Sequence, residues 1–295
     1  MEYILLLVSV FCTLSYRLAC NWFSKRLSKN GADLQRFNLL YSSVAAVGLL
    51  VLALIRSAAA PSLFTLLLGV LFGLLTAVSS LAMINALELG PLSYTSLICS
   101  AGMIIPALSG WLLFSEPVSV WKFVGTALML ISIAFSVWQK DDAERKASLK
   151  WLVLCLLAML TGGLIGVLQK VHQASEHSAE LFYFLAVSFT VSALYSAVLL
   201  FLLRKKGTAP SLRISQSRSL LWIALISGTT LAASHVLNLW LAGVMPSIIF
   251  FPVVNGVGLL LAVLASVVLF REKLTRIRWA GIVIGIIAVM LLCLA

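Results

Sequence analysis

The sequence predicts an all-α membrane protein with ten transmembrane helices, arranged as two inverted five-helix repeats. Three observations lead to this prediction: the composition, the lengths of the apolar runs, and a phrase that occurs twice with different charge. Of the 295 residues, 62% are hydrophobic and 11% are charged, whereas an average soluble domain has about 25% charged residues. Runs of about 20 apolar residues cross a hydrocarbon core as helices, because a helix satisfies its own backbone polar groups in lipid.

Ten apolar runs are long enough to cross a bilayer. They cover residues 3–23, 37–55, 63–87, 91–113, 118–138, 151–169, 180–203, 219–241, 246–269 and 277–294. A hydrophilic connection over 139–150 falls near the middle of the chain, so we predict one repeat over residues 1–138 and another over residues 149–295. Met1 and Glu2 lead directly into the first run without a basic segment or a small-residue cleavage site, so we expect this helix to remain in the mature protein.

The basic residues are divided unevenly between the two sides of the predicted helices. One side holds 18 of the 21 basic residues, namely Arg17, Lys25, Arg26, Lys29, Arg36, Lys140, Arg145, Lys146, Lys150, Arg204, Lys205, Lys206, Arg213, Arg218, Arg271, Lys273, Arg276 and Arg278. The other side holds Arg56, Lys122 and Lys170. Because Lys and Arg collect in cytoplasmic connections, we predict that both termini are extracytoplasmic. The formal charge of +11 then indicates a lipid bilayer as partner, in a plasma (inner) membrane, and no nucleic acid.

The repeated phrase carries a different charge in its two copies. LFSEPVSVWKFVG, residues 113–125, contains one basic residue, and LFREKLTRIRWAG, residues 269–281, contains four. An odd number of helices per repeat places the second copy on the opposite side of the membrane from the first, so the charge difference is a trace of inverted topology. Inverted repeats are a common construction of secondary transporters, with the binding site near the midplane where the repeats meet. We therefore expect a small-molecule substrate that is moved by alternating access.

Further parts of the two repeats also correspond. Asn85 to Gly90 (NALELG) answers Asn238 to Gly243 (NLWLAG), and Pro91 and Pro246 open the runs that follow. A ten-helix chain with A-L-x-x-G-P-L-S over residues 86–93 and with two L-F-x-E phrases resembles the EamA-like branch of the drug/metabolite transporter superfamily. The resemblance covers essentially the whole chain and implies a ten-helix permease without naming its cargo. Many members have both termini in the cytoplasm, whereas the charges of this chain indicate the opposite orientation.

Other function classes find little support in the sequence. Asp33, Asp141 and Asp142 are all expected in connections, as are His172 and His177, which we expect to be exposed. The chain has no H-E-x-x-H motif and no nucleotide-binding P-loop, and its five cysteines show no metal-site spacing. We therefore expect no enzyme, no cofactor and no metal. A channel or a non-transporting membrane scaffold remains the alternative, although no filter-like sequence is evident.

The candidate substrate site consists of polar residues at predicted membrane depth, where such groups require partners. Asn85 and Asn238 occupy equivalent places in the two repeats, and His235 lies three residues before Asn238 on the same helical face. Arg17 is a candidate partner for an anionic substrate group. The remaining candidates are Asn255, Ser96, Ser100, Tyr94 and Trp240.

Each of these residues also has a structural interpretation. The amides and the histidine can tie helices together by hydrogen bonds, Arg17 can extend toward the cytoplasmic surface, and the aromatic residues can pack or anchor the chain at the interface. Glu116 and Glu272 precede helices in both copies of the phrase, which favours first-turn electrostatics and loop packing. The three G-x-x-x-G motifs that start at Gly69, Gly162 and Gly281 allow close helix packing, within a monomer or in a homodimer.

The predicted orientation is testable by thiol labelling. Single cysteines that replace Ser28, Ser148 and Ser211 in a cysteine-free background should resist an impermeant reagent added to intact cells, because these positions are predicted to be cytoplasmic. A cysteine in place of Ser175 should react. The reverse pattern of labelling would show that the termini are cytoplasmic.

Overall fold

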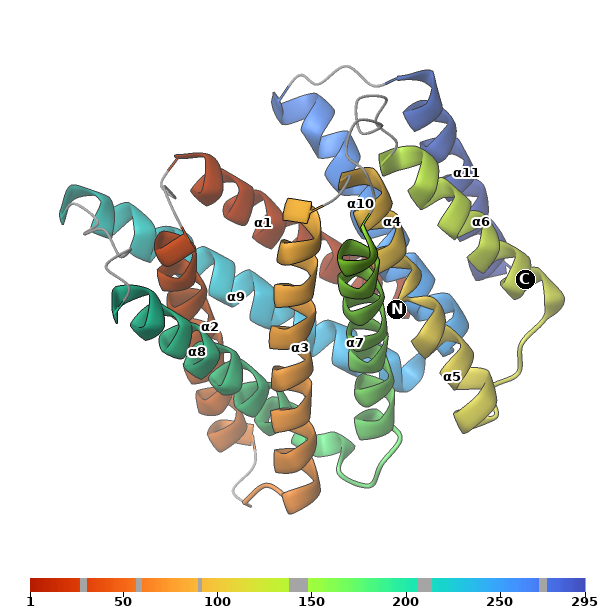
Figure 1. Ribbon diagram of the computed structural model, residues 1–295. Coiled ribbons are helices and arrows are strands. Elements are labelled where there is room, and N and C mark those ends of the chain that lie inside the picture. Colours follow the sequence, from red (N-terminus) through yellow and green to blue (C-terminus); the bar gives the residue numbers. More distant parts are fainter. Residues whose placement is uncertain are drawn as a thin grey trace. The chain divides into compact units, whose positions relative to one another are not determined.

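The computed structural model describes residues 1–26, 31–56, 60–89, 92–137, 148–205, 214–270 and 275–294 (Figure 1). All regular secondary structure in these ranges is helical. The α-helices are α1 (Glu2–Arg26), α2 (Gly31–Arg56), α3 (Leu63–Leu89), α4 (Leu92–Ala101), α5 (Ile104–Phe114), α6 (Val120–Val137), α7 (Leu149–Gln173), α8 (Leu181–Lys205), α9 (Ile214–Val244), α10 (Ser247–Phe270) and α11 (Arg276–Leu294). A short 3-10 helix, η2 (Ser178–Glu180), precedes α8.

Eight candidate membrane-spanning helices are present in the described ranges. They cover Glu2–Cys20, Ala32–Arg56, Leu63–Ala86, Thr95–Phe114, Leu149–Gln173, Ser178–Leu203, Arg218–Val244 and Arg276–Leu294. Two shorter apolar stretches, Val120–Ser136 and Ser247–Leu261, lie in α6 and α10. The all-helical class and the apolar helices fit the membrane protein that the composition predicts.

The predicted helix over residues 91–113 is interrupted in the structure. α4 ends at Ala101, a turn occupies Gly102 and Met103, and α5 begins at Ile104. Pro106 explains the break, because proline has no N–H to donate and its ring clashes with the carbonyl four residues earlier, here that of Gly102. The amide of Ile105 instead donates to the Gly102 oxygen at 3.1 Å, in a tighter turn.

The predicted connection around Asp33 is also wrong. Asp33 lies in the first turn of α2 and is only 2% exposed. Its carboxylate is 3.7 Å from the Arg36 guanidinium one turn later. An acidic residue in a first turn favours the helix, since it complements the positive end of the helix dipole. α2 therefore begins earlier than the apolar run alone indicates.

The chain divides into two compact units. Unit 1 contains residues 3–77 and 172–240, and unit 2 contains residues 78–171 and 241–295. The divisions fall inside α3, α7 and α9. Each unit thus contains helices from both predicted repeats. The two compact units therefore do not coincide with the predicted repeats, whose boundary lies between residues 138 and 149.

Unit 1 contains aromatic packing between α1 and α2. Phe23 and Phe37 stack with their ring centroids 4.2 Å apart, and Tyr41 meets Phe37 edge to face at 5.2 Å. Phe23 and Phe37 form a buried cluster with Leu220 and Ala224 of α9. α8 also packs along α2. These contacts hold α1, α2, α8 and α9 in one unit.

Unit 2 is centred on α6, which packs against α11 along its length (Figure 1). Met129 and Ile133 are fully buried on α6 and pack with Ala288 of α11. The Ser132 hydroxyl donates to the Gly281 carbonyl at 2.7 Å, where the missing side chain of Gly281 allows the close approach. Small residues at such a contact permit close packing of helices in lipid.

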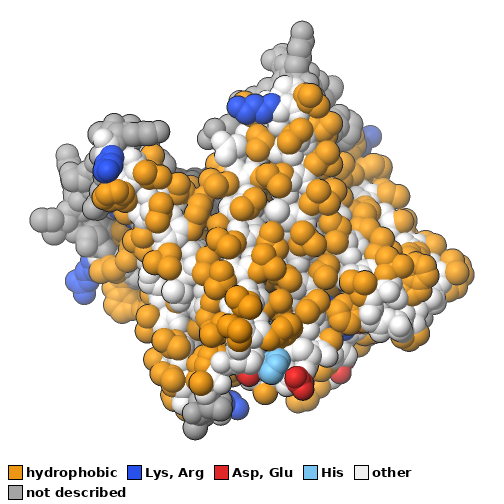
Figure 2. Space-filling model, turned by 60° about the horizontal axis from the view of Figure 1, so that its bottom comes forward, with side chains coloured by type: hydrophobic (Ala, Val, Ile, Leu, Met, Phe, Trp, Pro, Cys, Tyr) orange, Lys and Arg blue, Asp and Glu red, His pale blue; other side chains and the backbone are white. Residues whose placement is uncertain are grey.

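Hydrophobic side chains dominate the surface. Figure 2 shows a face covered largely by hydrophobic side chains, with few charged ones among them. On α2, for example, Val47 and Leu54 are each more than half exposed. A soluble monomer rarely exposes apolar patches larger than a few hundred Å². Such a surface suits contact with lipid.

The glycines of α3 provide a test of the packing in unit 1. A Cβ at Gly73 would lie 2.7 Å from Val191 Cβ and 2.8 Å from the Ser188 carbonyl oxygen of α8, whereas a Cβ at Gly48 of α2 would meet nothing within 4 Å. Gly73→Ala should therefore destabilise the protein by about 1–3 kcal/mol through overpacking. Gly48→Ala should leave the stability of the protein unchanged. Thermal unfolding of the purified variants measures both, and equal melting temperatures would contradict the described α3–α8 contact.

Candidate functional site

The candidate residue Asn238 lies in a polar cluster between α1 and α9 of unit 1. The Ser9 hydroxyl donates to the Asn238 amide oxygen at 2.6 Å, and the Thr13 and Ser234 hydroxyls are 2.6 Å apart. Ser9 and Ser234 are buried. Since all of these partners lie on one helix pair, the contacts of Asn238 match the interpretation in which the amide ties helices together.

His235 lies beside this cluster and packs among aromatic rings. Its ring centroid is 5.3 Å from that of Phe189 on α8 and 6.2 Å from that of Phe72 on α3, with both pairs nearly perpendicular. The Nδ1 atom is buried and has no hydrogen-bond partner. A buried polar atom without a partner costs about 1–3 kcal/mol, so the Nδ1 atom of His235 is an unsatisfied group of the predicted site.

The candidate amides of unit 2 are less constrained. Asn85 on α3 and Asn255 on α10 are both exposed, and each donates one amide hydrogen to the carbonyl four residues earlier in its own helix, at 2.8 Å. Their remaining polar atoms have no hydrogen bond to the described residues. Asn85 belongs to unit 2, whereas Asn238 belongs to unit 1.

The other candidates contribute less. Ser96 and Ser100 are half-buried on α4, and Trp240 near the end of α9 is 38% exposed. The side chains of Arg17, Tyr94 and Glu88 lie outside the described part of the molecule, as does Glu272. The structure therefore brings Asn238 and His235 together in unit 1.

Unit 2 contains an ion pair that the sequence alone did not indicate. Lys170 Nζ lies 2.5 Å from Glu116 Oε1, and the two side chains are only 9% and 13% exposed. Lys170 is inside the candidate span Leu149–Gln173, and Glu116 is in the connection between α5 and α6. A charge pair inside an apolar helical protein is rare and expensive, which makes it a functional candidate.

The same two side chains also contact the break between α9 and α10. The backbone N–H of Ser247, the first residue of α10, donates to Glu116 Oε2 at 2.6 Å, and the Ser247 hydroxyl donates to Oε1 at 3.2 Å. Lys170 Nζ donates to the carbonyl of Met245, just after the end of α9, at 3.4 Å. Glu116 therefore stabilises the start of α10, and not that of α6, the helix that follows it in the sequence.

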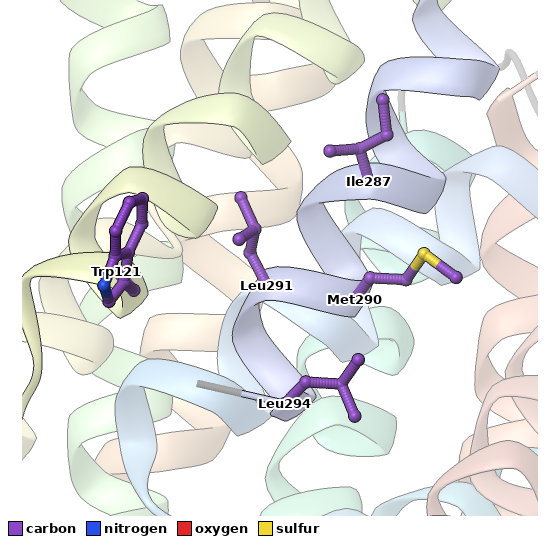
Figure 3. A pocket seen from close by; sticks show the side chains of 5 residues that line it. All are labelled: Trp121, Ile287, Met290, Leu291 and Leu294. Atoms are coloured by element: carbon purple, nitrogen blue, oxygen red, sulfur yellow. The ribbon is translucent and has the colours of Figure 1, made fainter.

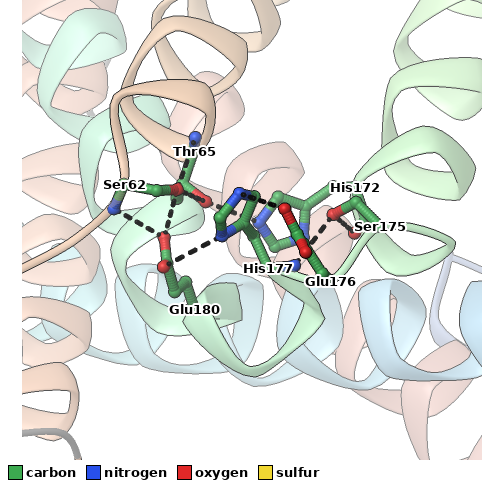
Figure 4. Close-up of polar contacts among 7 residues, drawn as sticks. All are labelled: Ser62, Thr65, His172, Ser175, Glu176, His177 and Glu180. Atoms are coloured by element: carbon green, nitrogen blue, oxygen red, sulfur yellow. Dashed lines mark hydrogen bonds and ion pairs between the residues drawn. The ribbon is translucent and has the colours of Figure 1, made fainter.

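A second polar cluster ties the start of α3 to the start of α8 in unit 1 (Figure 4). Glu180 accepts hydrogen bonds from the Ser62 backbone N–H at 2.9 Å and from its hydroxyl at 2.7 Å. His177 lies between Glu180 and Glu176, at 3.4 and 3.6 Å. Ser62 in turn accepts the Thr65 N–H at 3.2 Å, the contact of an N-cap residue. Glu180 therefore reinforces the cap of α3.

The prediction that His172 is exposed is wrong. α7 continues to Gln173, beyond the predicted end of the apolar run, and carries His172 into the core with no exposed surface. Its Nε2 lies 3.3 Å from the Thr65 hydroxyl, and its Nδ1 lies 3.2 Å from the Gln173 amide nitrogen. Phe184 packs against the ring at 4.5 Å. His172 is a satisfied core residue.

A surface groove of about 410 Å³ lies in unit 2 between α6 and α11 (Figure 3). Its lining is apolar and consists of Trp121, Ile287, Met290, Leu291 and Leu294. A groove without convergent polar groups cannot orient a polar solute. Across the described ranges, no group of three or more His, Cys, Asp and Glu side chains is placed to hold a metal ion.

Comparisons with known proteins identify the fold alone. No protein-family model and no curated protein matches this chain. Among 29 matching chains of solved structures, one described only as "Crystal structure of protein" superposes with a TM-score of 0.70 at 14% sequence identity, over 98% of both chains. The helix arrangement is thus one that another protein shares over its whole length, at an identity too low to carry function.

The α1–α9 tie is testable with two serines of α1. Ser9→Ala removes the donor to Asn238 and should destabilise the protein by about 0.6 kcal/mol and at most about 1.7 kcal/mol, the average and the maximum for hydrogen bonds between membrane helices. Ser15 is exposed and, among the described residues, donates to the Phe11 carbonyl of its own helix alone, so Ser15→Ala should be neutral. Thermal unfolding compares the two, and equal effects would mean that the contact to Asn238 contributes nothing.

Proposed function

We propose that the protein is a multi-pass secondary transporter, which moves a small polar or amphipathic metabolite across the membrane by alternating access. The repeated phrase carries the proposal, since its change from one basic residue at 113–125 to four at 269–281 is what two inverted five-helix repeats produce. Inverted repeats are typical of transporters that rock around a central site. The resemblance to EamA-like permeases points the same way, although no family model matches.

The packing of the helices supports the inverted repeat. Under the proposed repeat, the predicted spans at residues 37–55, 91–113 and 118–138 are equivalent to those at 180–203, 246–269 and 277–294. In the described residues the most extensive helix contacts join these equivalents, namely α2 with α8, α5 with α10, and α6 with α11. Contacts between equivalent helices arise when a two-fold axis relates two repeats. Ten spanning helices then require that α6 and α10 also cross the bilayer.

Asn85, His235 and Asn238 are the proposed substrate-binding residues, because the two asparagines occupy equivalent places in the two sequence repeats. The unused polar atoms of Asn85 and the unpartnered Nδ1 of His235 are groups that a ligand with donors and acceptors would satisfy. Arg17 would hold an anionic group. The further residues proposed to contact substrate are Asn255, Ser96, Ser100, Tyr94 and Trp240.

The charges constrain the coupling mechanism. Glu116, a largely buried carboxylate in the α5–α6 connection, is already neutralised by Lys170. A proton-driven cycle would then have to use His235 or a repositioned Glu88, the ionisable residue that follows the predicted run over residues 63–87. Facilitated or exchange transport is therefore the proposed mechanism, in a plasma (inner) membrane and with both termini outside.

The first experiment identifies the ligand. Purified protein is screened by thermal shift against amino acids, nucleobases, sugars and amphipathic cations, since a ligand present at 100 times its Kd stabilises by about 2.7 kcal/mol. Each hit is then tested for uptake or exchange in proteoliposomes. Binding without transport would favour a scaffold or receptor, and ion conductance without saturable uptake would favour a channel.

The second experiment separates substrate binding from helix tying. Asn85→Ala and Asn238→Ala should each weaken binding of the identified ligand about tenfold or more, as expected when a hydrogen bond to a buried partner is lost. Ser9→Ala is the control, because it breaks the helix tie of Asn238 and leaves the amide in place. If Asn238→Ala lowers the melting temperature like Ser9→Ala, and both asparagine variants bind and transport normally, the site lies elsewhere.

A further inference from the structure

The Glu116–Lys170 pair is matched in polarity to the helix break on which it lies. α9 ends at Val244 and α10 begins at Ser247. The carbonyls at the end of a helix carry partial negative charge and the amides at the start of a helix carry partial positive charge. Lys170 contacts the Met245 carbonyl and Glu116 contacts the Ser247 amide. Each charged side chain therefore contacts the helix end of opposite partial charge. If the lysine and the glutamate exchanged positions, each would contact a helix end of like partial charge.

The backbone around Glu116 is shaped to deliver its carboxylate to this position. Ser115, at the C-terminal cap of α5, is the one non-glycine residue with a positive φ in the described ranges, at 51°. The amide of Glu116 donates to the Gly110 carbonyl at 3.0 Å. A Cβ on Gly110 would overlap Glu116 Oε2 and would come within 2.5 Å of Ser247 Cβ. A left-handed serine is strained, and such strain persists where surrounding contacts determine it.

The energetics of the pair favour a contact that opens. A buried ion pair contributes little net stability, because desolvation of the two charges offsets their attraction. Removing one partner alone destabilises the protein, since it leaves an uncompensated buried charge. Hydrating both charges together leaves no such buried charge, so it costs little. The same contacts join four segments of unit 2: the α5–α6 connection, the end of α7, the end of α9 and the start of α10.

We propose that Glu116 and Lys170 form a polarity-specific latch, which closes the end of unit 2 around the α9–α10 break and opens by hydration of both charges. This end is the one that the basic residues predict to be extracytoplasmic. The inference goes beyond the proposed function, because it concerns a conformational equilibrium of unit 2 that exists whether or not the protein transports a solute.

Thiol labelling of the full-length purified protein tests the latch. Met245 lies in the break and is 2% exposed, so Met245→Cys in a background without the five native cysteines reports opening. A water-soluble methanethiosulfonate reagent should modify this cysteine slowly in the parent. Glu116→Gln and Lys170→Met should each accelerate labelling about tenfold or more, because each leaves one charge unpaired. Lys122→Met is the charge control and should leave the rate unchanged.

The exchanged pair Glu116→Lys with Lys170→Glu discriminates most sharply. If the two residues formed only an ordinary ion pair, the exchanged variant would keep that pair, and the Met245→Cys thiol would be modified as slowly as in the parent. The latch would not close in the exchanged variant, since lysine would then face the start of α10 and glutamate the end of α9. Fast labelling of the exchanged variant supports the latch, and slow labelling overturns its polarity.

A graded variant covers the case in which the charge variants do not fold. Gly110→Ala displaces the Glu116 carboxylate without removing a charge and should also accelerate labelling, whereas Gly258→Ala on α10, where a Cβ would meet nothing within 4 Å, should not. If Gly110→Ala labels at the parent rate, the latch is excluded. Neither measurement needs a substrate, so a failed latch leaves the transport proposal standing, and an absence of transport leaves the latch standing.

Discussion

The ion pair between Lys170 and Glu116 is the contact on which the end of unit 2 depends. In an apolar helical protein each charge must find a partner, because an isolated one costs several kcal/mol. Here the two charges neutralise each other at 2.5 Å, and they also satisfy an amide and a carbonyl that the break between α9 and α10 leaves unpaired. The break, the left-handed turn at Ser115 and the absence of a side chain at Gly110 are all consistent with this single arrangement.

Hydropathy predicts the helices well and their interruptions poorly. The long apolar runs coincide with the eight candidate membrane-spanning helices of the described ranges, because a helix that crosses lipid needs about 20 apolar residues. The break at Gly102 was missed because it depends on the backbone geometry of Pro106, which a sum of side-chain polarities does not register. Asp33 and His172 were assigned to connections for a related reason. Both lie in helix turns beyond the apolar runs, where a first-turn carboxylate and a hydrogen-bonded imidazole extend the helix.

The candidate site shows what residue type alone can predict. Asn238 and His235 are polar residues in an apolar helix, and their presence at a helix contact followed from that fact. Their partners did not, since Ser9 and Phe189 are ordinary residues of distant helices. Lys170 was counted among the connection charges because it stands near the end of its run, and only packing shows that it faces Glu116. The G-x-x-x-G motif at Gly69 did predict packing, and both of its glycines contact α8.

The tie between α1 and α9 has a consequence for biosynthesis. Ser9 and Asn238 are 229 positions apart, so at 5–20 residues per second the ribosome completes the second roughly 10–45 s after the first. During that interval α1 is already made and its hydroxyls lack their final acceptors. Thr13 has an interim partner, the Ser9 carbonyl at 3.0 Å in its own turn, but the Ser9 hydroxyl has its described acceptors only on α9. α1 is therefore synthesised early and docks late, and its polar face lacks its final partners while the rest of the chain is made.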